Sequence, residues 1–325
     1  MDHEIVDSGG ALQSAAPEKR GDLMIQARGL CKRYGSAAAV DNLSFDVQPG
    51  VVTGFLGPNG SGKSTTMRLM LGLDHGDGRT TFGGREYREI EDPLRAVGVM
   101  LDARAVHPKR SARAHLRMIA DGGGIDRKRV DEVLEIVGLR SVAGKYAGGF
   151  SLGMRQRLGL AAALLGDPAV LILDEPANGL DPEGVRWLRD LLKQLAQQGC
   201  TIFVSSHLLN EMAHLADSLI VIGAGRLIAA ESATEFVHRN TAARIVARVD
   251  RPRELAEALS RNGFPAGIRP DGAVVVEGRD RQAVAEIAMR AGLLITELTQ
   301  AHSSLEDAFF HATDGAAQYR AHSAA

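Results

Sequence analysis

The sequence has few cysteines and no marked excess of charge of either sign. Only 2 of its 325 residues are cysteine, Cys31 and Cys200, too few for a disulfide framework, so we expect a reducing compartment. Its 38 Lys and Arg residues nearly balance 40 Asp and Glu residues, which gives a formal net charge of −2. Because nucleic-acid-binding domains are usually strongly basic, this balance predicts no nucleic-acid partner.

Long hydrophobic runs are also absent from the sequence. The most apolar stretches, residues 158–165 and 169–173, are separated by Asp167-Pro168 and followed by Asp174-Glu175. Neither approaches the roughly 20 apolar residues that a membrane-spanning helix needs. We therefore expect any role at a membrane to depend on docking onto another protein. Hydrophobic residues still make up 45% of the chain, enough for a sizeable buried core.

The pattern along the chain indicates one large domain after a short tail. Residues 1–21 are small, polar and charged, which is typical of a flexible tail. Over residues 22–240, short apolar runs alternate with helical patterns, which predicts an α/β domain with a mostly parallel sheet. Its predicted elements are buried strands at 51–56, 170–173 and 201–204, a helix from 64 to 71, and a helical insert over about 103–150.

The last quarter of the chain has a different texture. Residues 241–325 predict a small α+β accessory domain, of ferredoxin-like type, with a flexible C-terminal end and no catalytic cluster. The predicted strands cover residues 244–249, 273–277 and 293–298, and the predicted helices cover 252–262, 279–291 and 303–310. Ser303 or Ser304 is expected to cap the final helix.

A glycine-rich segment follows the predicted strand at 51–56 and precedes a predicted helix. It matches the P-loop pattern G-x-x-x-x-G-K-[ST] with Gly57, Pro58, Asn59, Gly60, Ser61, Gly62, Lys63 and Ser64, followed by Thr65. Glycines let the backbone curl around phosphates, and the helix N-terminus favours anions. We expect Lys63 to reach the β- and γ-phosphates of ATP and the Ser64 hydroxyl to ligate Mg²⁺.

A second candidate feature is the apolar strand at 170–173, which ends in Asp174 and Glu175. Two carboxylates at the end of a fully buried strand are costly unless the charges have a function. We expect Asp174 to help hold Mg²⁺, directly or through water. Glu175 is then placed to act as the general base on the attacking water.

Shortly before the acidic strand, residues 150–157 read Phe-Ser-Leu-Gly-Met-Arg-Gln-Arg. This segment resembles the signature motif of the ATP-binding-cassette family, usually Leu-Ser-Gly-Gly-Gln. The chain departs from that pattern at Phe150, Leu152 and Met154 but keeps Ser151 and Gly153. The resemblance covers about residues 23–234 and implies that Ser151 and the Gly153 amide bind the γ-phosphate held by a second copy of the domain.

Further family landmarks fall in the expected order. Tyr34 resembles the aromatic residue that stacks on adenine, and Asp181 lies in a segment that resembles the loop touching the partner domain. His207 resembles the switch histidine that contacts the γ-phosphate. Where the family usually has a glutamine that contacts Mg²⁺, this chain has Asp102, as some drug and peptide-antibiotic exporters do. Aspartate is shorter and cannot donate a hydrogen bond as glutamine does.

The resemblance implies an ATP-hydrolysing subunit, with ATP and Mg²⁺ as ligands, that energises an exporter of drugs or antibiotic-like compounds. The implied partners are separate transmembrane permease subunits and a second nucleotide-binding subunit, in a homodimer or with a different cassette, at the cytoplasmic face of the cell membrane. Two alternatives remain: a soluble cassette ATPase acting on ribosomes, and a nucleotide-dependent regulator without transport. Chromosome-type ATPases carry long heptad arms, and residues 64–151 have no room for them.

Overall fold

The computed structural model describes residues 23–102, 105–206, 209–240, 244–277, 280–301 and 305–313. The tail expected over residues 1–21 lies outside these ranges. In the described part of the chain, no helix is both long and apolar enough to cross a lipid bilayer.

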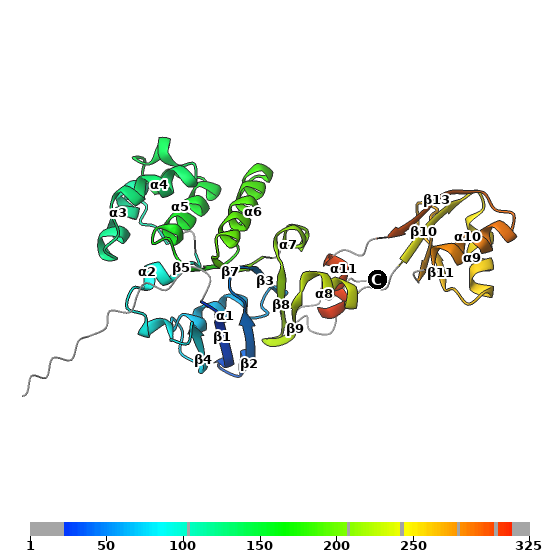
Figure 1. Ribbon diagram of the computed structural model, residues 1–325, viewed down its shortest axis with the longest axis horizontal. Helices are drawn as coiled ribbons and strands as arrows, with labels where there is room; N and C mark the ends of the chain where they lie inside the picture. The colour runs from blue at the N-terminus through cyan, green and yellow to red at the C-terminus, as the bar shows by residue number, and fades with distance from the viewer. Residues whose placement is uncertain are drawn as a thin grey trace, which may run out of the picture.

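A six-stranded sheet forms the centre of the larger unit (Figure 1). Its strand order is β5-β6-β7-β3-β8-β9, and all neighbouring pairs are parallel except β8 and β9. The strands are β3 (Val52–Leu56), β5 (Val97–Met100), β6 (Val170–Leu173), β7 (Thr201–Ser205), β8 (Ser218–Gly223) and β9 (Arg226–Ser232). All residues of β3, β6 and β7 are buried, as strands covered on both faces of a parallel sheet must be.

One face of this sheet packs against a smaller antiparallel sheet and the helix after β3. The second sheet has the order β2-β1-β4, and these elements are β1 (Ile25–Tyr34), β2 (Ala37–Val47), β4 (Asp77–Phe82) and α1 (Lys63–Met70). Three phenylalanines join the two sheets, since the Phe203 ring lies 5.6 Å from that of Phe45 and 4.9 Å from that of Phe55. Aromatic contacts at this spacing stabilise the layer.

The other face of the six-stranded sheet is covered by helices. These are α5 (Leu152–Leu164), α6 (Pro182–Gln197), α7 (Leu209–Leu215) and α8 (Ala233–Asn240). The expected helical insert lies between β5 and α5, at one end of the molecule (Figure 1). It contains α3 (Ala112–Gly122), α4 (Lys128–Ile136) and two short 3₁₀ turns, η2 (Arg140–Val142) and η3 (Ala147–Gly149). A 3₁₀ turn and a short helix, η1 (Tyr87–Glu89) and α2 (Pro93–Ala96), lie between β4 and β5.

Beyond α8 the chain forms a four-stranded antiparallel sheet with two helices. The elements are β10 (Arg244–Val249), α9 (Pro252–Arg261), β11 (Ala266–Ile268), β12 (Val274–Glu277), α10 (Arg281–Arg290) and β13 (Ile295–Ala301). Their order, β11-β12-β10-β13, gives the β-α-β-β-α-β arrangement of a ferredoxin-like unit, as predicted. Leu255 and Leu259 of α9 pack with Val284 of α10 in the hydrophobic core of this unit, which is separate from the cores of the larger unit.

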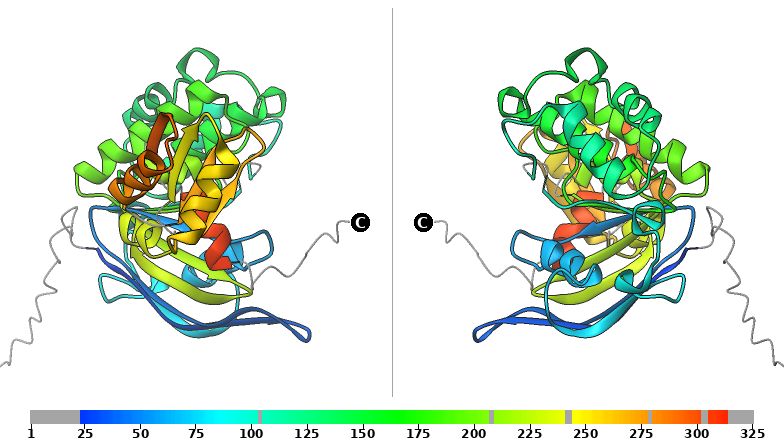
Figure 2. Two further views of the ribbon diagram at one scale, coloured as in Figure 1. Left: turned by 90° about the vertical axis from the view of Figure 1, so that its right-hand side faces the viewer. Right: turned by 90° about the vertical axis from the view of Figure 1, so that its left-hand side faces the viewer.

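The final helix, α11 (Leu305–Thr313), does not join that four-stranded unit. It packs against α7 and α8, so the chain returns to the larger unit after building the accessory sheet (Figures 1 and 2). Leu305, Ala308 and Phe309 are buried in the same core cluster as the helices that cover the six-stranded sheet. Ser303 and Ser304, expected to cap this helix, lie outside the described residues.

Candidate nucleotide-binding and hydrolysis site

The glycine-rich loop joins β3 to α1 at the centre of the six-stranded sheet. A side chain at Gly57 would place its Cβ 2.4 Å from Ser61 Oγ and 2.6 Å from the Ile222 carbonyl oxygen. Gly62 has a φ of 103°, and a Cβ there would lie 2.2 Å from the Ala39 carbonyl oxygen. Glycine is therefore required at both positions: at Gly57 because of the close approach, and at Gly62 because of both the close approach and the left-handed backbone.

Two side chains of this loop are arranged for an anion. Lys63 is 8% exposed, and its Nζ donates hydrogen bonds to the carbonyl oxygens of Gly57 (2.8 Å) and Pro58 (3.4 Å). Burial lowers the pKa of Lys63, while the carboxylates of Glu175 and Asp174 oppose that shift. Ser61 Oγ is buried and has no hydrogen-bond partner among the described residues. A phosphate group would satisfy both side chains, so the loop fits the nucleotide that the sequence predicts.

The two predicted carboxylates follow β6, beside the end of β7. Because Leu173 pairs with Val204 in the parallel ladder, Asp174 comes next to Ser205. Ser205 Oγ donates to Asp174 Oδ1 at 2.5 Å and accepts a hydrogen bond from the Glu175 N–H at 2.9 Å. Glu175 has a φ of 49°, in the left-handed region that non-glycine residues rarely adopt. Backbone strain of this kind is typical of functional sites.

A cavity of about 270 Å³ brings Asp102 together with the two carboxylates. Its lining residues are Leu101, Asp102, Leu152, Gln156, Asp174, Glu175 and Asn178. The described residues contain no cluster of three or more His, Cys, Asp or Glu side chains that could hold a metal ion alone. Mg²⁺ is usually held by one or two carboxylates together with substrate phosphates, so this donor set fits a metal that arrives with a nucleotide.

The remaining predicted residues lie at the ends of elements. Tyr34 ends β1 with 55% of its surface exposed, and Lys32 Nζ lies 5.2 Å from its ring centroid. Ser151 caps α5, where its Oγ accepts from the Met154 N–H at 3.2 Å. Asp181 caps α6 in the same way, accepting from the Gly184 N–H at 2.8 Å.

Helix α5, which begins in the predicted signature motif, also approaches the loop before α6. A Cβ on Gly153 would lie 2.8 Å from the carbonyl oxygen of Gly179, so this glycine permits the close contact. His207, the predicted switch histidine, lies outside the described residues. The structure thus groups Asp102, Asp174 and Glu175 around one cavity, which Leu152 at the start of α5 also lines, while Ser151 itself is not among the lining residues.

Sequence reasoning missed three residues of this site. Ser205, Gln156 and Asn178 contact Glu175 or line its cavity. The signal for Ser205 is its place at the end of the strand 201–204, which the parallel sheet sets beside Asp174. The positions of Gln156 and Asn178 at this cavity depend on the packing of α5 against the loop after β6. The sequence carries no local signal for that packing.

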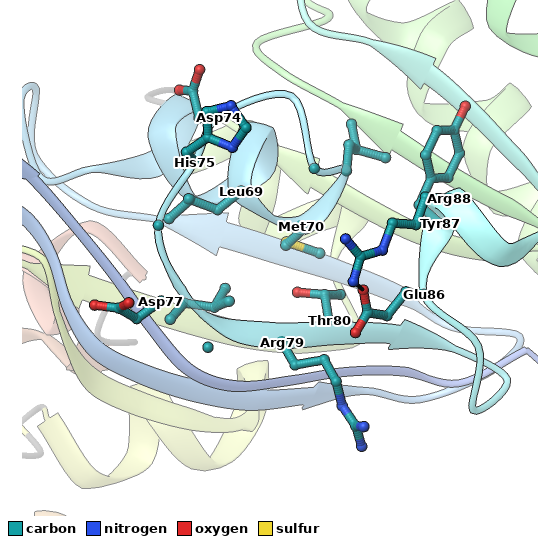
Figure 3. Close-up of a pocket in the computed structure, with 15 residues that line it drawn as sticks. Leu69, Met70, Asp74, His75, Asp77, Arg79, Thr80, Glu86, Tyr87 and Arg88 are labelled. Carbon is teal, nitrogen blue, oxygen red and sulfur yellow. Dashed lines mark ion pairs between the residues drawn. The ribbon is translucent and has the colours of Figure 1, made fainter.

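A further cavity, of about 310 Å³, lies between the end of α1, β4 and η1 (Figure 3). Charged side chains line much of it, including Asp74, Arg79 and an ion pair of Arg88 with Glu86 at 2.8 Å. None of the predicted site residues lines this cavity.

A P-loop after the central strand of a parallel sheet, with two carboxylates at the end of a nearby strand, defines a P-loop nucleotide-binding protein. The family model described as ABC transporter matches residues 40–178, and one described as Domain of unknown function (DUF8746) matches residues 243–306. The bacitracin transport ATP-binding protein BcrA of Enterococcus faecalis is 34% identical, over 89% of this chain and 96% of its own length. BcrA of Bacillus licheniformis is 44% identical, over 63% of this chain and 68% of its own length.

Solved structures agree with the fold of the larger unit. An ATP-binding subunit of an ABC transporter superposes with a TM-score of 0.61 at 23% identity, covering 66% of this chain and 92% of that structure. The cassette MJ0796, a dimer bound to ADP and Pi, gives a TM-score of 0.58 at 23% identity, covering 64% of this chain and 98% of that structure. The chain belongs to the ABC transporter family and is a nucleotide-binding ATPase of that family.

Proposed function

We propose that this chain hydrolyses ATP as one half of a cassette dimer and energises the export of a drug or antibiotic-like compound through separate membrane-spanning subunits. The observation that carries the proposal is similarity over nearly the whole chain, accessory unit included, to a bacitracin transport ATP-binding protein. Relatives named for lantibiotic transport and linearmycin resistance are 36% identical over 63% and 66% of this chain. The proposal therefore places the chain at the cytoplasmic face of the membrane.

Each chain supplies the residues that bind and activate ATP. The P-loop amides and Lys63 hold the phosphates, and Tyr34 offers an exposed ring for the adenine. Ser64 and Asp174 would hold Mg²⁺, and Asp102 lines the same cavity as Asp174. When bound, Mg²⁺ would neutralise charge that develops on the phosphates. Glu175 accepts a proton from the attacking water, and His207 helps hold that water.

The second copy completes each site. Ser151 is exposed at the N-terminus of α5, where helix N–H groups favour an anion. This placement supports a role for Ser151 and Gly153 on the nucleotide held by a partner. Because one chain carries both halves of the site, a homodimer would have two complete sites.

A capture experiment tests the function. Tagged Glu175→Gln protein is expected to bind MgATP without hydrolysing it, and so to hold its closed complex. We expect it to co-purify with a stoichiometric membrane-spanning protein from detergent-solubilised membranes of the source organism. The Lys63→Ala variant, which loses the buried ammonium, is the control and should capture less. Recovery of ribosomes, or of no membrane protein, would leave the ATPase assignment standing and rule out the export role.

A further inference from the structure

We propose that Ser205 is a positioning residue for ATP hydrolysis, which holds the general base Glu175 and the metal-binding Asp174 in one fixed arrangement. The inference rests on the proposed roles of those two carboxylates. Ser205 ends β7 and its side chain is fully buried, with 0% of the residue exposed. Its hydroxyl contacts both residues, donating to the Asp174 carboxylate and accepting from the Glu175 N–H.

The direction of these two hydrogen bonds is fixed by chemistry. A backbone N–H can only donate, so Ser205 Oγ must accept from Glu175, and its single proton is then free for Asp174 Oδ1. The hydroxyl thus acts as a bridge between the carboxylate proposed for the metal and the backbone of the proposed base. No other hydroxyl on β7 reaches these residues among the hydrogen bonds of the described chain, since Thr201 lies at the opposite end of the strand.

The bridge matters because the Glu175 backbone is strained. A left-handed conformation is unfavourable for a non-glycine residue, so neighbouring groups must hold Glu175 in it. Ser205 secures the N–H of Glu175, while the Glu175 carbonyl oxygen accepts from the Asn178 N–H at 3.2 Å and lies 3.5 Å from Gln156 Nε2. Without the Ser205 hydroxyl, we expect the peptide to relax and the Glu175 side chain to leave its catalytic position.

The strand itself offers a matched control for loss of a buried hydroxyl. Thr201, at the other end of β7, is also 0% exposed. Its Oγ1 donates to the Leu23 carbonyl oxygen at 3.1 Å and accepts from the Gly50 N–H at 3.4 Å. Thr201→Val therefore removes one donated and one accepted bond from the same strand, as Ser205→Ala does, but far from the two carboxylates.

The test compares Ser205→Ala, Ser205→Thr and Thr201→Val in the full chain. Removing a partner that orients a metal-site residue typically costs 10- to 100-fold in activity, so we expect kcat of Ser205→Ala to fall by about that factor. ATP affinity in the Glu175→Gln background, measured with a fluorescent analogue, should stay within about twofold because the P-loop is intact. Ser205→Thr keeps the hydroxyl and should restore kcat. Thr201→Val should lower the melting temperature with kcat unchanged.

Two results would overturn the proposal: a kcat of Ser205→Ala within twofold of the parent, or equal losses of kcat in Ser205→Ala and Thr201→Val that follow their melting temperatures. If Ser205→Ala does not fold, Ser205→Cys, a weak hydrogen-bonding residue of similar size, takes its place with the same expected loss.

Electron paramagnetic resonance of bound Mn²⁺ gives a readout without turnover, and we expect an altered spectrum for Ser205→Ala alone. Should Glu175→Gln itself keep full activity, the general-base assignment is wrong, which is distinguishable from failure of Ser205.

Discussion

The guanidinium of Arg157 lies 4.3 Å from the centroid of the Trp187 ring, and this contact joins α5 to α6. Arg157 Nη1 also donates to the Val137 carbonyl oxygen at 3.0 Å, which ties both helices to the end of α4. Ser151, of the predicted signature motif, caps α5, and Asp181 caps α6. The stacked pair therefore lies between the two elements that are proposed to meet the partner cassette.

Substitution of Arg157 by lysine should loosen this junction. Lysine keeps the charge but loses the planar stack and the fixed hydrogen bond to Val137, so we expect a loss of about 1–2 kcal/mol in the free energy of unfolding. Trp187 is the single tryptophan of the chain, so its fluorescence reports on this site directly. The exposed neighbour Arg186 gives the control variant Arg186→Lys. Equal stability of the two variants would contradict the structural role of the stack.

The buried face of α11 predicts that the C-terminal helix stabilises the larger unit. Phe309 is 7% exposed within its core, whereas the adjacent Phe310 is 60% exposed. We expect Phe309→Ala to cost about 3–5 kcal/mol in the free energy of unfolding, because it leaves a cavity, and Phe310→Ala to cost under about 0.5 kcal/mol. Chemical denaturation measures both. Two variants of equal stability would show that α11 does not depend on this contact.

The strongly patterned elements of the fold could be predicted from the sequence. The strand 170–173 is apolar throughout and is observed with those bounds, because a fully buried strand leaves an uninterrupted signal. The antiparallel sheet of β1, β2 and β4 was not predicted: β1 and β2 form a hairpin that was not identified from the sequence, and the pairing of β1 with β4 joins segments far apart in the chain. The return of α11 was missed for a related reason: its apolar face does not reveal which core it joins.

Part of the candidate site could likewise be predicted from the sequence, and part could not. The P-loop and the acidic strand end are local motifs, so their residues could be named from spacing alone. The cavity that joins Asp102 to Asp174 depends on the parallel pairing of β5 with β6, a tertiary relationship. The strain at Glu175 has no sequence signal, because glutamate carries no preference for a left-handed backbone.

Neutralising Asp102 should weaken metal binding more than catalysis. Asp102 shares a cavity with Asp174 and Glu175, so Asp102→Asn removes one negative charge from the proposed metal site. We expect the Mg²⁺ concentration for half-maximal ATPase activity to rise about three- to tenfold, which corresponds to about 1 kcal/mol of charge interaction. Asp92→Asn, on an exposed residue paired with Arg95, is the control. An unchanged Mg²⁺ requirement would remove Asp102 from the metal site.

The buried histidine of the helical insert predicts a loss of stability in acid. His115 on α3 is 7% exposed, and its Nδ1 is buried without a hydrogen-bond partner in the described chain. Burial, and secondly the positive charge of Arg110, lower the pKa of His115 below its ordinary value of 6.5. The unfolded chain therefore takes up a proton near pH 6.5 that the folded chain refuses, so the stability contributed by neutral His115 is complete above that pH and decreases below it.

The pH dependence of stability that His115 contributes is limited, because this residue takes up a single proton. His115 can contribute a slope of at most about 1.4 kcal/mol per pH unit between its unfolded and folded pKa values. Urea denaturation between pH 7.5 and 5 measures the slope, and we expect His115→Gln to flatten it because glutamine does not titrate. Arg110→Gln removes one cause of the lowered pKa and should give an intermediate slope. If His115→Gln and the parent chain lose stability in parallel on acidification, the acid sensitivity comes from other groups.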